Sequence, residues 1–526
     1  MQLLNIFAAF ALFLIIAKAV FNLRSKKPRG AKDLPGPKGK PFVGSKLGKG
    51  YFWFKFSEWG EKYGPIYQFK SYGNVNVVVS TEKMANDLLR ERGTIYSSRQ
   101  QMPMASQLLS DNKRALFLPY GDEWRTVRKF QHAVTMPKAA TSYQPLQLQE
   151  SARLVRDLIL EPKNYHTLFQ RYASGLILRL TYDERIETGE EETVRLVYTN
   201  QVNAERVAAP GQYLVDVLPI LLWVPKWLAP FKQEAAAHRK REVALFSGLV
   251  DKVKKDIEAG TAGPSFTRKW LESKQEYGMS DIQAAYVLGG LYSAAASTTA
   301  SLAMSWVLMM VLNPKWLLKA QEELDRVVGA GRLPTFDDLP NLPMIRAIVK
   351  ETARLRPVTA GGIAHKSTED DVYEGYFIPK GSLIHPNLWS IQRDPELYPD
   401  PDSFNPDRWL NPKFPTFKEP LSQYPNCQNY SVFGFGRRLC PGSNIAERSL
   451  NIIVARLSWA CNITKAKDPK TGKQITPPSY DYTQGLNTEP RRFPFELACR
   501  SPERWKIIEE EALEAAKELR KPVVKT

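Results

Sequence analysis

The residues best suited to chemistry in this sequence surround Cys440, in residues 433–442 (FGFGRRLCPG). Gly434 and Gly436 let the backbone turn tightly and let a flat ligand approach the main chain. A helical pattern follows Pro441, and a helix N-terminus offers free N–H groups and a positive dipole, both of which favour a thiolate. These features suit a sulfur that acts as a ligand. Taken alone, however, the better interpretation of Cys440 is a buried structural cysteine in a glycine-rich turn.

This loop resembles the haem-binding loop of the cytochrome P-450 superfamily, Phe-x-x-Gly-x-Arg-x-Cys-x-Gly. Every fixed position of that pattern is matched, by Phe433, Gly436, Arg438, Cys440 and Gly442. The resemblance implies a haem-thiolate monooxygenase whose cofactor is haem b, with its iron bound by Cys440. It also implies O2 and NADPH-derived electrons as co-substrates, and the mainly α fold with small β-sheets (α+β) of that superfamily.

Glu351 and Arg354 are three residues apart in a helical pattern, so their side chains share one face and can pair. By itself this is an ordinary surface ion pair, which contributes little to stability. In the resembled family the pair is buried and is joined by an arginine from a later loop, which is Arg408 in this sequence. The resemblance therefore implies a structural triad that fixes the loop beneath the haem.

The two propionates of a haem need cationic or polar partners. The resemblance assigns that role to Trp124 and Arg128 in a Trp-x-x-x-Arg pattern, to His365 and to Arg438, with Phe433 as a further haem-binding residue. Each has a simpler interpretation when taken alone: Trp124 as a core residue, Arg128 on a solvated face, and His365 at a strand end.

Residues 293–299 (SAAASTT) lie in the middle of a long apolar helical pattern, where small residues would let a ligand approach the helix. Plain packing of small residues is the alternative. The resembled family usually has Ala-Gly-x-Asp/Glu-Thr-Thr here, which places Ala295 on the glycine and Ser297 on the acid. Thr298 and Ser297 are the candidate catalytic residues, because in that family the acid and the threonine relay protons to bound oxygen. Serine lacks the acidic proton of a carboxyl group, so we expect protons to come from water or from another side chain, or the proton supply to be less important in this protein.

The elements that must position these residues are mostly helices. Helical patterns cover residues 281–312, 314–328 and 342–355, and short strands are expected at 66–70, 75–79 and 371–377. We predict a basic, proline-rich linker at 24–45, one large domain at 46–500 and a charged, helical tail at 501–526.

The first 23 residues are expected to be a transmembrane signal anchor. Residues 3–21 are apolar except for Asn5 and Lys18, and five lysines and arginines follow within residues 24–32. By the positive-inside rule the large domain then lies in the cytosol, behind a single helix in the endoplasmic reticulum membrane. A cleaved secretory peptide is the alternative, but it needs a basic region before the apolar stretch and a small-residue cleavage site after it.

The net charge of +18 and the pI near 9.5 suit an anionic membrane surface or an acidic protein partner. No nucleic-acid-binding motif is present, so we expect no nucleic acid partner. The sequence also has no glycine motif for flavin or nicotinamide. Electrons are therefore expected from a separate NADPH-cytochrome reductase, with cytochrome b5 as a second donor, docking near Arg437 and Lys129.

Apolar residues gather between residues 99 and 124 and between 206 and 231, the two regions that roof the haem in the resembled fold. A lipophilic small-molecule substrate is therefore expected, although taken singly these leucines suit ordinary core helices equally well. Residues 96–99 and 374–381 are similar to fungal microsomal members, several of which act in secondary metabolism. Two other functions remain open: a haem-thiolate isomerase or dehydratase that needs no reductase, and a non-catalytic haem-binding module.

Overall fold

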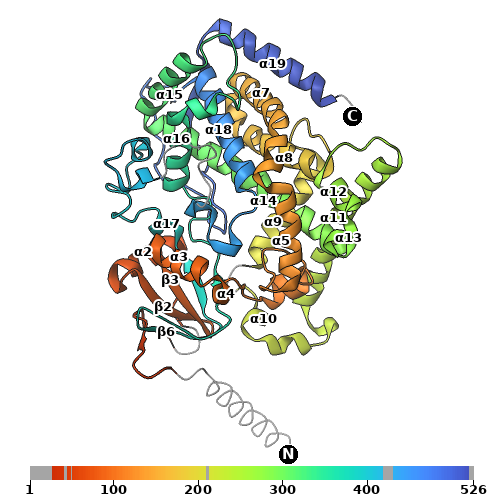
Figure 1. The fold of residues 1–526 in the computed structure, drawn as a ribbon, viewed down its shortest axis with the longest axis vertical. Helices are drawn as coiled ribbons and strands as arrows, with labels where there is room; N and C mark the ends of the chain where they lie inside the picture. Colours follow the sequence, from red (N-terminus) through yellow and green to blue (C-terminus); the bar gives the residue numbers. More distant parts are fainter. Residues whose placement is uncertain (1–26, 41–43, 49, 209–211, 419–429, 521–526) are drawn as a thin grey trace, which may run out of the picture.

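The structure is a computed structural model that describes residues 27–40, 44–48, 50–208, 212–418 and 430–520. The predicted anchor at residues 1–23 lies outside the described residues, as do Cys427 and the last residues of the predicted tail. Most of the described chain is helical, and the strands β2 (Ile66–Ser71), β3 (Asn74–Val79) and β6 (Tyr376–Ile378) lie together at one end of the molecule (Figure 1).

Helices outnumber strands along the chain. The α-helices are α2 (Phe52–Tyr63), α3 (Glu82–Asn86), α4 (Gly93–Tyr96), α5 (Asp122–Thr135), α6 (Pro137–Ser142), α7 (Gln144–Leu160), α8 (Tyr165–Tyr182), α9 (Glu192–Val207), α10 (Leu214–Val217), α11 (Pro230–Glu258), α12 (Phe266–Glu272), α13 (Lys274–Tyr277), α14 (Asp281–Leu312), α15 (Pro314–Val327), α16 (Pro343–Leu355), α17 (Leu388–Ile391), α18 (Ser443–Ala460) and α19 (Pro502–Arg520). The strands are β1 (Lys32–Asp33), β2 (Ile66–Ser71), β3 (Asn74–Val79), β4 (His365–Lys366), β5 (Asp371–Tyr373), β6 (Tyr376–Ile378), β7 (Leu383–Pro386), β8 (Cys461–Lys465) and β9 (Phe495–Cys499).

Helix α14 crosses the middle of the helical part and confirms the longest predicted helix. The hydroxyl of Ser280 caps its first turn by accepting from the N–H of Gln283 at 3.3 Å. Pro314 follows its last residue closely, and proline cannot continue a helix. The helix is long and apolar enough to cross a membrane, but 67% of its most apolar stretch is buried inside the protein. It is therefore the central core helix, which packs most extensively on α8.

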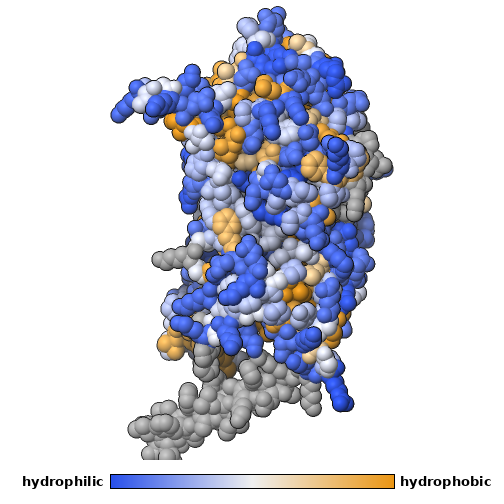
Figure 2. Space-filling view, turned by 90° about the vertical axis from the view of Figure 1, so that its left-hand side faces the viewer, coloured by the Kyte–Doolittle hydropathy of each residue, from blue (hydrophilic) through white to orange (hydrophobic). Residues whose placement is uncertain are grey.

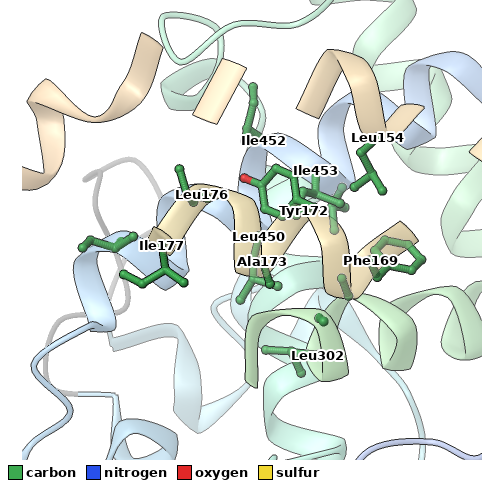
Figure 3. Packing of buried hydrophobic residues seen from close by; sticks show 14 of the residues in the cluster. Leu154, Phe169, Tyr172, Ala173, Leu176, Ile177, Leu302, Leu450, Ile452 and Ile453 are labelled. Atoms are coloured by element: carbon green, nitrogen blue, oxygen red, sulfur yellow. The ribbon is translucent and has the colours of Figure 1, made fainter. Parts of the chain in front are cut away.

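One large apolar core joins the helices behind the Cys440 loop. Figure 3 shows side chains from α7, α8, α14 and α18 meeting in it; among them are Leu154, Phe169, Tyr172, Ala173, Leu302, Leu450 and Ile453. Because α18 follows the Cys440 loop directly, this packing fixes the loop against the body of the protein.

The strands form three sheets, ordered β1-β6-β5, β2-β3-β7-β4 and β8-β9. The predicted strand at 371–377 is wrong as a single strand, because the chain turns back within it. Glu374 and Gly375 both have positive φ, of 49° and 80°, and these two residues form the tight turn between β5 and β6. The other two predicted strands are confirmed by β2 and β3.

The charged tail is helical over α19, as predicted, and this helix packs on α7 (Figure 1). Ile508, Ala512 and Ala515 are buried on its inner side. The side of the molecule drawn in Figure 2 is mainly hydrophilic, with apolar residues in small groups. Such a surface suits a domain that faces water.

Candidate functional site

Two short turns shape the loop that carries Cys440. They are the 3-10 turns η9 (Ser431–Phe433) and η10 (Gly436–Arg438), and the N–H of Cys440 donates to the carbonyl oxygen of Phe433 at 2.9 Å. Gly436 has a φ of 53°, and a Cβ atom there would lie 2.2 Å from the carbonyl oxygen of Leu89. The glycine is therefore required for the loop to pack against the neighbouring turn.

The surroundings of the Cys440 sulfur act on its ionisation in two directions. Burial raises the pKa of the Cys440 thiol, while the N–H groups of Gly442 and Ser443 and the charge of Arg128 act to lower it. The sulfur thus has donors that favour a thiolate, whereas its burial favours the neutral thiol. A metal cation bound to the sulfur would remove this conflict, so the donor set fits a haem iron.

The predicted propionate-binding residues lie together around this loop. A guanidinium N–H of Arg128 donates to the carbonyl oxygen of Leu439, next to Cys440. The guanidinium of Arg438 lies over the ring of Trp124, 4.7 Å from its centroid. Arg438 also donates to the carbonyl oxygens of Ser97, at 2.7 Å, and Leu118, at 2.6 Å.

His365 and Arg99 belong to the same cluster. The buried His365 ring places Nδ1 2.8 Å from the carbonyl oxygen of Tyr96. Arg99, also buried, donates to the carbonyl oxygens of Ile363 and Ala364. Arg99 was not among the predicted site residues, because its spacing from the Cys440 loop carries no pattern and only the fold brings the two segments together.

Within the described residues, this cluster contains arginines but no acidic partner for them. Burial lowers the pKa of Arg99 to about 9 and that of Arg438 to about 8, and Arg99 and Arg128 act on Arg438 in the same direction. Among the described residues, no carboxylate pairs with any of these three arginines. Buried guanidinium groups need an anionic partner, and the two propionates of haem b supply two negative charges. The residues present therefore fit the cofactor.

The predicted triad is assembled in the interior. Arg354 contacts both carboxylate oxygens of Glu351, and Arg408 donates to the same carboxylate at 3.4 Å. Trp409 was not predicted to take part, yet its indole N–H donates to Glu351 at 3.1 Å. Arg354 also donates to the carbonyl oxygens of Gln392 and Pro401. The pair of Glu351 and Arg354 therefore joins α16 to the chain segments that precede the Cys440 loop.

The candidate catalytic residues lie on a stretch of α14 that is partly exposed to solvent. Leu291 to Ser293 and Thr299 to Ala303 are buried, whereas Ala294 is exposed and residues 295–298 are half-buried. Thr298 donates its hydroxyl to the carbonyl oxygen of Ala294 at 3.0 Å. Among the described residues, no hydrogen bond links Thr298 or Ser297 to the Cys440 loop, and this stretch carries no carboxyl group.

Comparisons with known proteins agree with this geometry. The family model described as Cytochrome P-450 matches residues 34–477. Cytochrome P-450 monooxygenase 58 of Postia placenta is 35% identical over 489 residues, covering 92% of this chain and 91% of that protein. Cytochrome P-450 monooxygenase verL of Clonostachys rogersoniana is 35% identical over 505 residues, with 94% and 92% covered.

A solved structure shows the same fold. It is a zebra fish cytochrome P-450 with abiraterone, with a TM-score of 0.67 and 21% identity, covering 85% of this chain and 100% of that one. The Cys440 loop, the buried triad and an arginine cluster without an acidic partner among the described residues occur together in a chain that matches these proteins over most of its length. The protein therefore belongs to the cytochrome P-450 family and is a cytochrome P-450 monooxygenase.

Proposed function

We propose that this enzyme inserts one oxygen atom from O2 into a lipophilic small molecule, a secondary metabolite, with electrons that a separate reductase takes from NADPH. The observation that carries this proposal is the cluster of Arg99, Arg128 and Arg438, which has no acidic partner among the described residues and lies against the Cys440 loop. It fits haem b, which when bound supplies the iron at which O2 is reduced.

Each residue of the site then has a distinct task. Cys440 would hold the iron, and the N–H groups of Gly442 and Ser443 would stabilise its negative charge. Trp124, Arg128, His365 and Arg438 would hold the propionates, with Arg99 added to the predicted set, and Phe433 positions Cys440 through its carbonyl oxygen. The triad of Glu351, Arg354 and Arg408 keeps the loop beneath the cofactor in place.

In this proposal, water supplies the protons at the part of the site that α14 forms. Thr298 offers a hydroxyl that is already bonded to the helix backbone, and Ser297 offers a second hydroxyl in place of an acid. A hydroxyl passes a proton on only when it receives one, since its own pKa lies far above neutral pH. Water that enters beside the half-buried Ser297 would supply that proton.

The proposal includes attachment to the endoplasmic reticulum membrane through residues 1–23, with the linker at 24–45 and a cytosolic domain at 46–500. It is supported by an exposed apolar group after α9, where Ile220 is 64%, Trp223 85% and Trp227 75% exposed. Strand β1, which lies in the predicted linker, pairs with β6. In Figure 1, β6 and α10 lie at the same end of the molecule. Tryptophan is favoured at membrane interfaces, so this end suits a lipid surface through which a lipophilic substrate arrives.

NADPH-cytochrome reductase, and cytochrome b5 as a second donor, would dock on the cationic surface near Cys440. Arg437 is exposed and contacts the ring of Tyr120, while Lys129 lies on α5 and pairs with Glu276 at 3.2 Å. Among the described residues, no carboxylate pairs with Arg437, so its charge is available to an acidic partner. This supports docking at this surface.

The experiment that tests this function uses the metabolite that accumulates when the gene is deleted. The full-length protein, reconstituted in lipid vesicles with NADPH-cytochrome reductase, is expected to convert that compound and to add one atom from isotopically labelled O2. Omitting NADPH or reductase should abolish the product. Conversion that persists without electrons would contradict the proposal and indicate an isomerase or dehydratase.

A further inference from the structure

Two cysteines outside the haem site face each other across a pair of strands. β8 and β9 are antiparallel, and their register places Cys461 directly opposite Cys499. The N–H of Arg500 donates to the carbonyl oxygen of Ala460 at 2.9 Å, which makes the adjacent cysteine pair a non-hydrogen-bonded pair. Side chains of such a pair lie on the same face of the sheet and approach closely.

This geometry is compatible with a disulfide. Opposite residues in a non-hydrogen-bonded pair have Cα atoms about 4.5 Å apart. That separation is at the short end of the range that a disulfide bridges, about 4.4–6.8 Å. Both residues are free thiols in this structure. The pair can therefore be linked without moving either strand far.

The two thiols differ in access. Cys461 is fully buried in the large core, whereas Cys499 is half-buried, and its S–H lies 3.3 Å from the carbonyl oxygen of Ser501. Burial raises the pKa of Cys461 well above its usual value, and the neighbouring Cys499 adds to this effect. An oxidant from solvent therefore meets Cys499 first, while Cys461 is held against it as the second thiol.

We propose that Cys461 and Cys499 are a site of reversible oxidation by hydrogen peroxide. The thiol of Cys499 attacks peroxide, the O–O bond breaks, and a sulfenic acid and one water form. The Cys461 sulfur then attacks the Cys499 sulfur, and the hydroxyl group leaves as a second water with the Cys461 proton. In total, two thiols lose two electrons and two protons, and peroxide is reduced to two waters. This site is independent of the substrate proposed above.

The link would join two parts of the fold that are far apart in the chain. Cys461 directly follows the last residue of α18, the helix that follows the Cys440 loop, and Cys499 lies three residues before α19 begins. Arg500 and Arg504 already hold this junction by pairing with Asp325 at 2.6 and 2.7 Å. The disulfide would add a covalent bond at a junction that is now held by ion pairs and packing.

The test uses the full-length, haem-loaded protein exposed to a tenfold excess of hydrogen peroxide, then alkylated and digested with trypsin without reduction. We expect a cross-linked peptide that joins residues 457–465 to residues 493–500 in most of the protein. Dithiothreitol should return both peptides to alkylatable thiols. The proposed disulfide does not involve the haem site. The spectrum of the reduced protein with carbon monoxide therefore serves as the control for folding.

Matched variants test which cysteines form the cross-link. Cys499→Ser should abolish the cross-linked peptide, whereas Cys427→Ser should leave it. If a variant fails to fold, the peptide map of the wild-type protein still decides. Recovery of Cys499 as sulfinic or sulfonic acid with Cys461 still alkylatable would overturn the proposal, and so would a disulfide that joins two chains.

Discussion

Arg354 donates two hydrogen bonds to Glu351, from Nε to Oε2 at 2.8 Å and from Nη2 to Oε1 at 2.9 Å, and neither side chain is exposed. Arg408, Trp409 and the backbone N–H of Asn405 donate to the same carboxylate. A buried carboxylate that accepts these five hydrogen bonds is fully satisfied, so its surroundings are fixed in one arrangement. Residues between Gln392 and Trp409 are hydrogen-bonded to Glu351 and Arg354. This pair therefore determines the position of that segment more than it adds stability.

Removing the carboxylate should leave two buried guanidinium groups without their anion. Breaking a buried ion pair typically costs about 3–5 kcal/mol, so Glu351→Ala should lower the free energy of unfolding by about that amount. The measurement is urea unfolding followed by circular dichroism, together with the haem content of the purified protein. Glu322→Ala removes an exposed carboxylate on α15 and is the matched control, with an effect below about 0.5 kcal/mol. Equal losses in both variants would contradict the structural role of the triad.

Replacing the proposed iron ligand should change the spectrum of the reduced protein with carbon monoxide. The wild type should show the Soret shift typical of thiolate ligation, because an iron bound to Cys440 would favour the thiolate, which the N–H groups of Gly442 and Ser443 also favour. Cys440→Ala should lose that shift, and Cys499→Ser, which changes a thiol in another part of the fold, should keep it. An unchanged spectrum in Cys440→Ala would show that another residue binds the iron.

The sequence predicted the parts of this fold that depend on local patterns. Periodicity and proline boundaries gave α14, α15 and α16 to within a residue, because apolar spacing and helix ends are local properties. The turn at Glu374 was missed, since positive φ in a glutamate has no sequence marker. Arg99 and Trp409 were missed because only tertiary packing carries them to the Cys440 loop and to Glu351.

Arg99 should matter for keeping haem bound. One charge-assisted hydrogen bond contributes about 1.5–3 kcal/mol, and about 1.4 kcal/mol corresponds to a factor of ten. Arg99→Met should therefore release haem to apomyoglobin at least about tenfold faster than the wild type. Arg125→Met removes an equal charge from the exposed side of α5 and should release haem at the wild-type rate. If Arg99→Met also matched the wild type, Arg99 would not face the propionates.

The exposed tryptophans should lie at the lipid interface. In full-length protein bound to vesicles, quenching by lipids labelled near the headgroup should act mainly on Trp223 and Trp227, which are exposed by 85% and 75%. The double variant Trp223→Phe and Trp227→Phe should lose most of the lipid-dependent quenching. Trp316→Phe removes a buried tryptophan and should retain it. Equal quenching in both variants would place another surface against the membrane.

Ser297 is where the site departs most from the pattern of the family, and an acid placed there tests the consequence. Ser297 is half-buried, so burial would raise the pKa of an aspartate there and make it a better proton donor near neutral pH. General acids contribute about 10²–10⁴-fold to proton transfer, so Ser297→Asp should lower the fraction of NADPH electrons lost as peroxide severalfold. Peroxide and product are measured in the same turnover assay, with Ser297→Ala as the control that adds no acid. Haem content should stay at the wild-type level in both variants. If Ser297→Asp left both coupling and product pattern unaltered, protons would already reach the site at a sufficient rate, and the proposed gap in proton supply at Ser297 would be wrong.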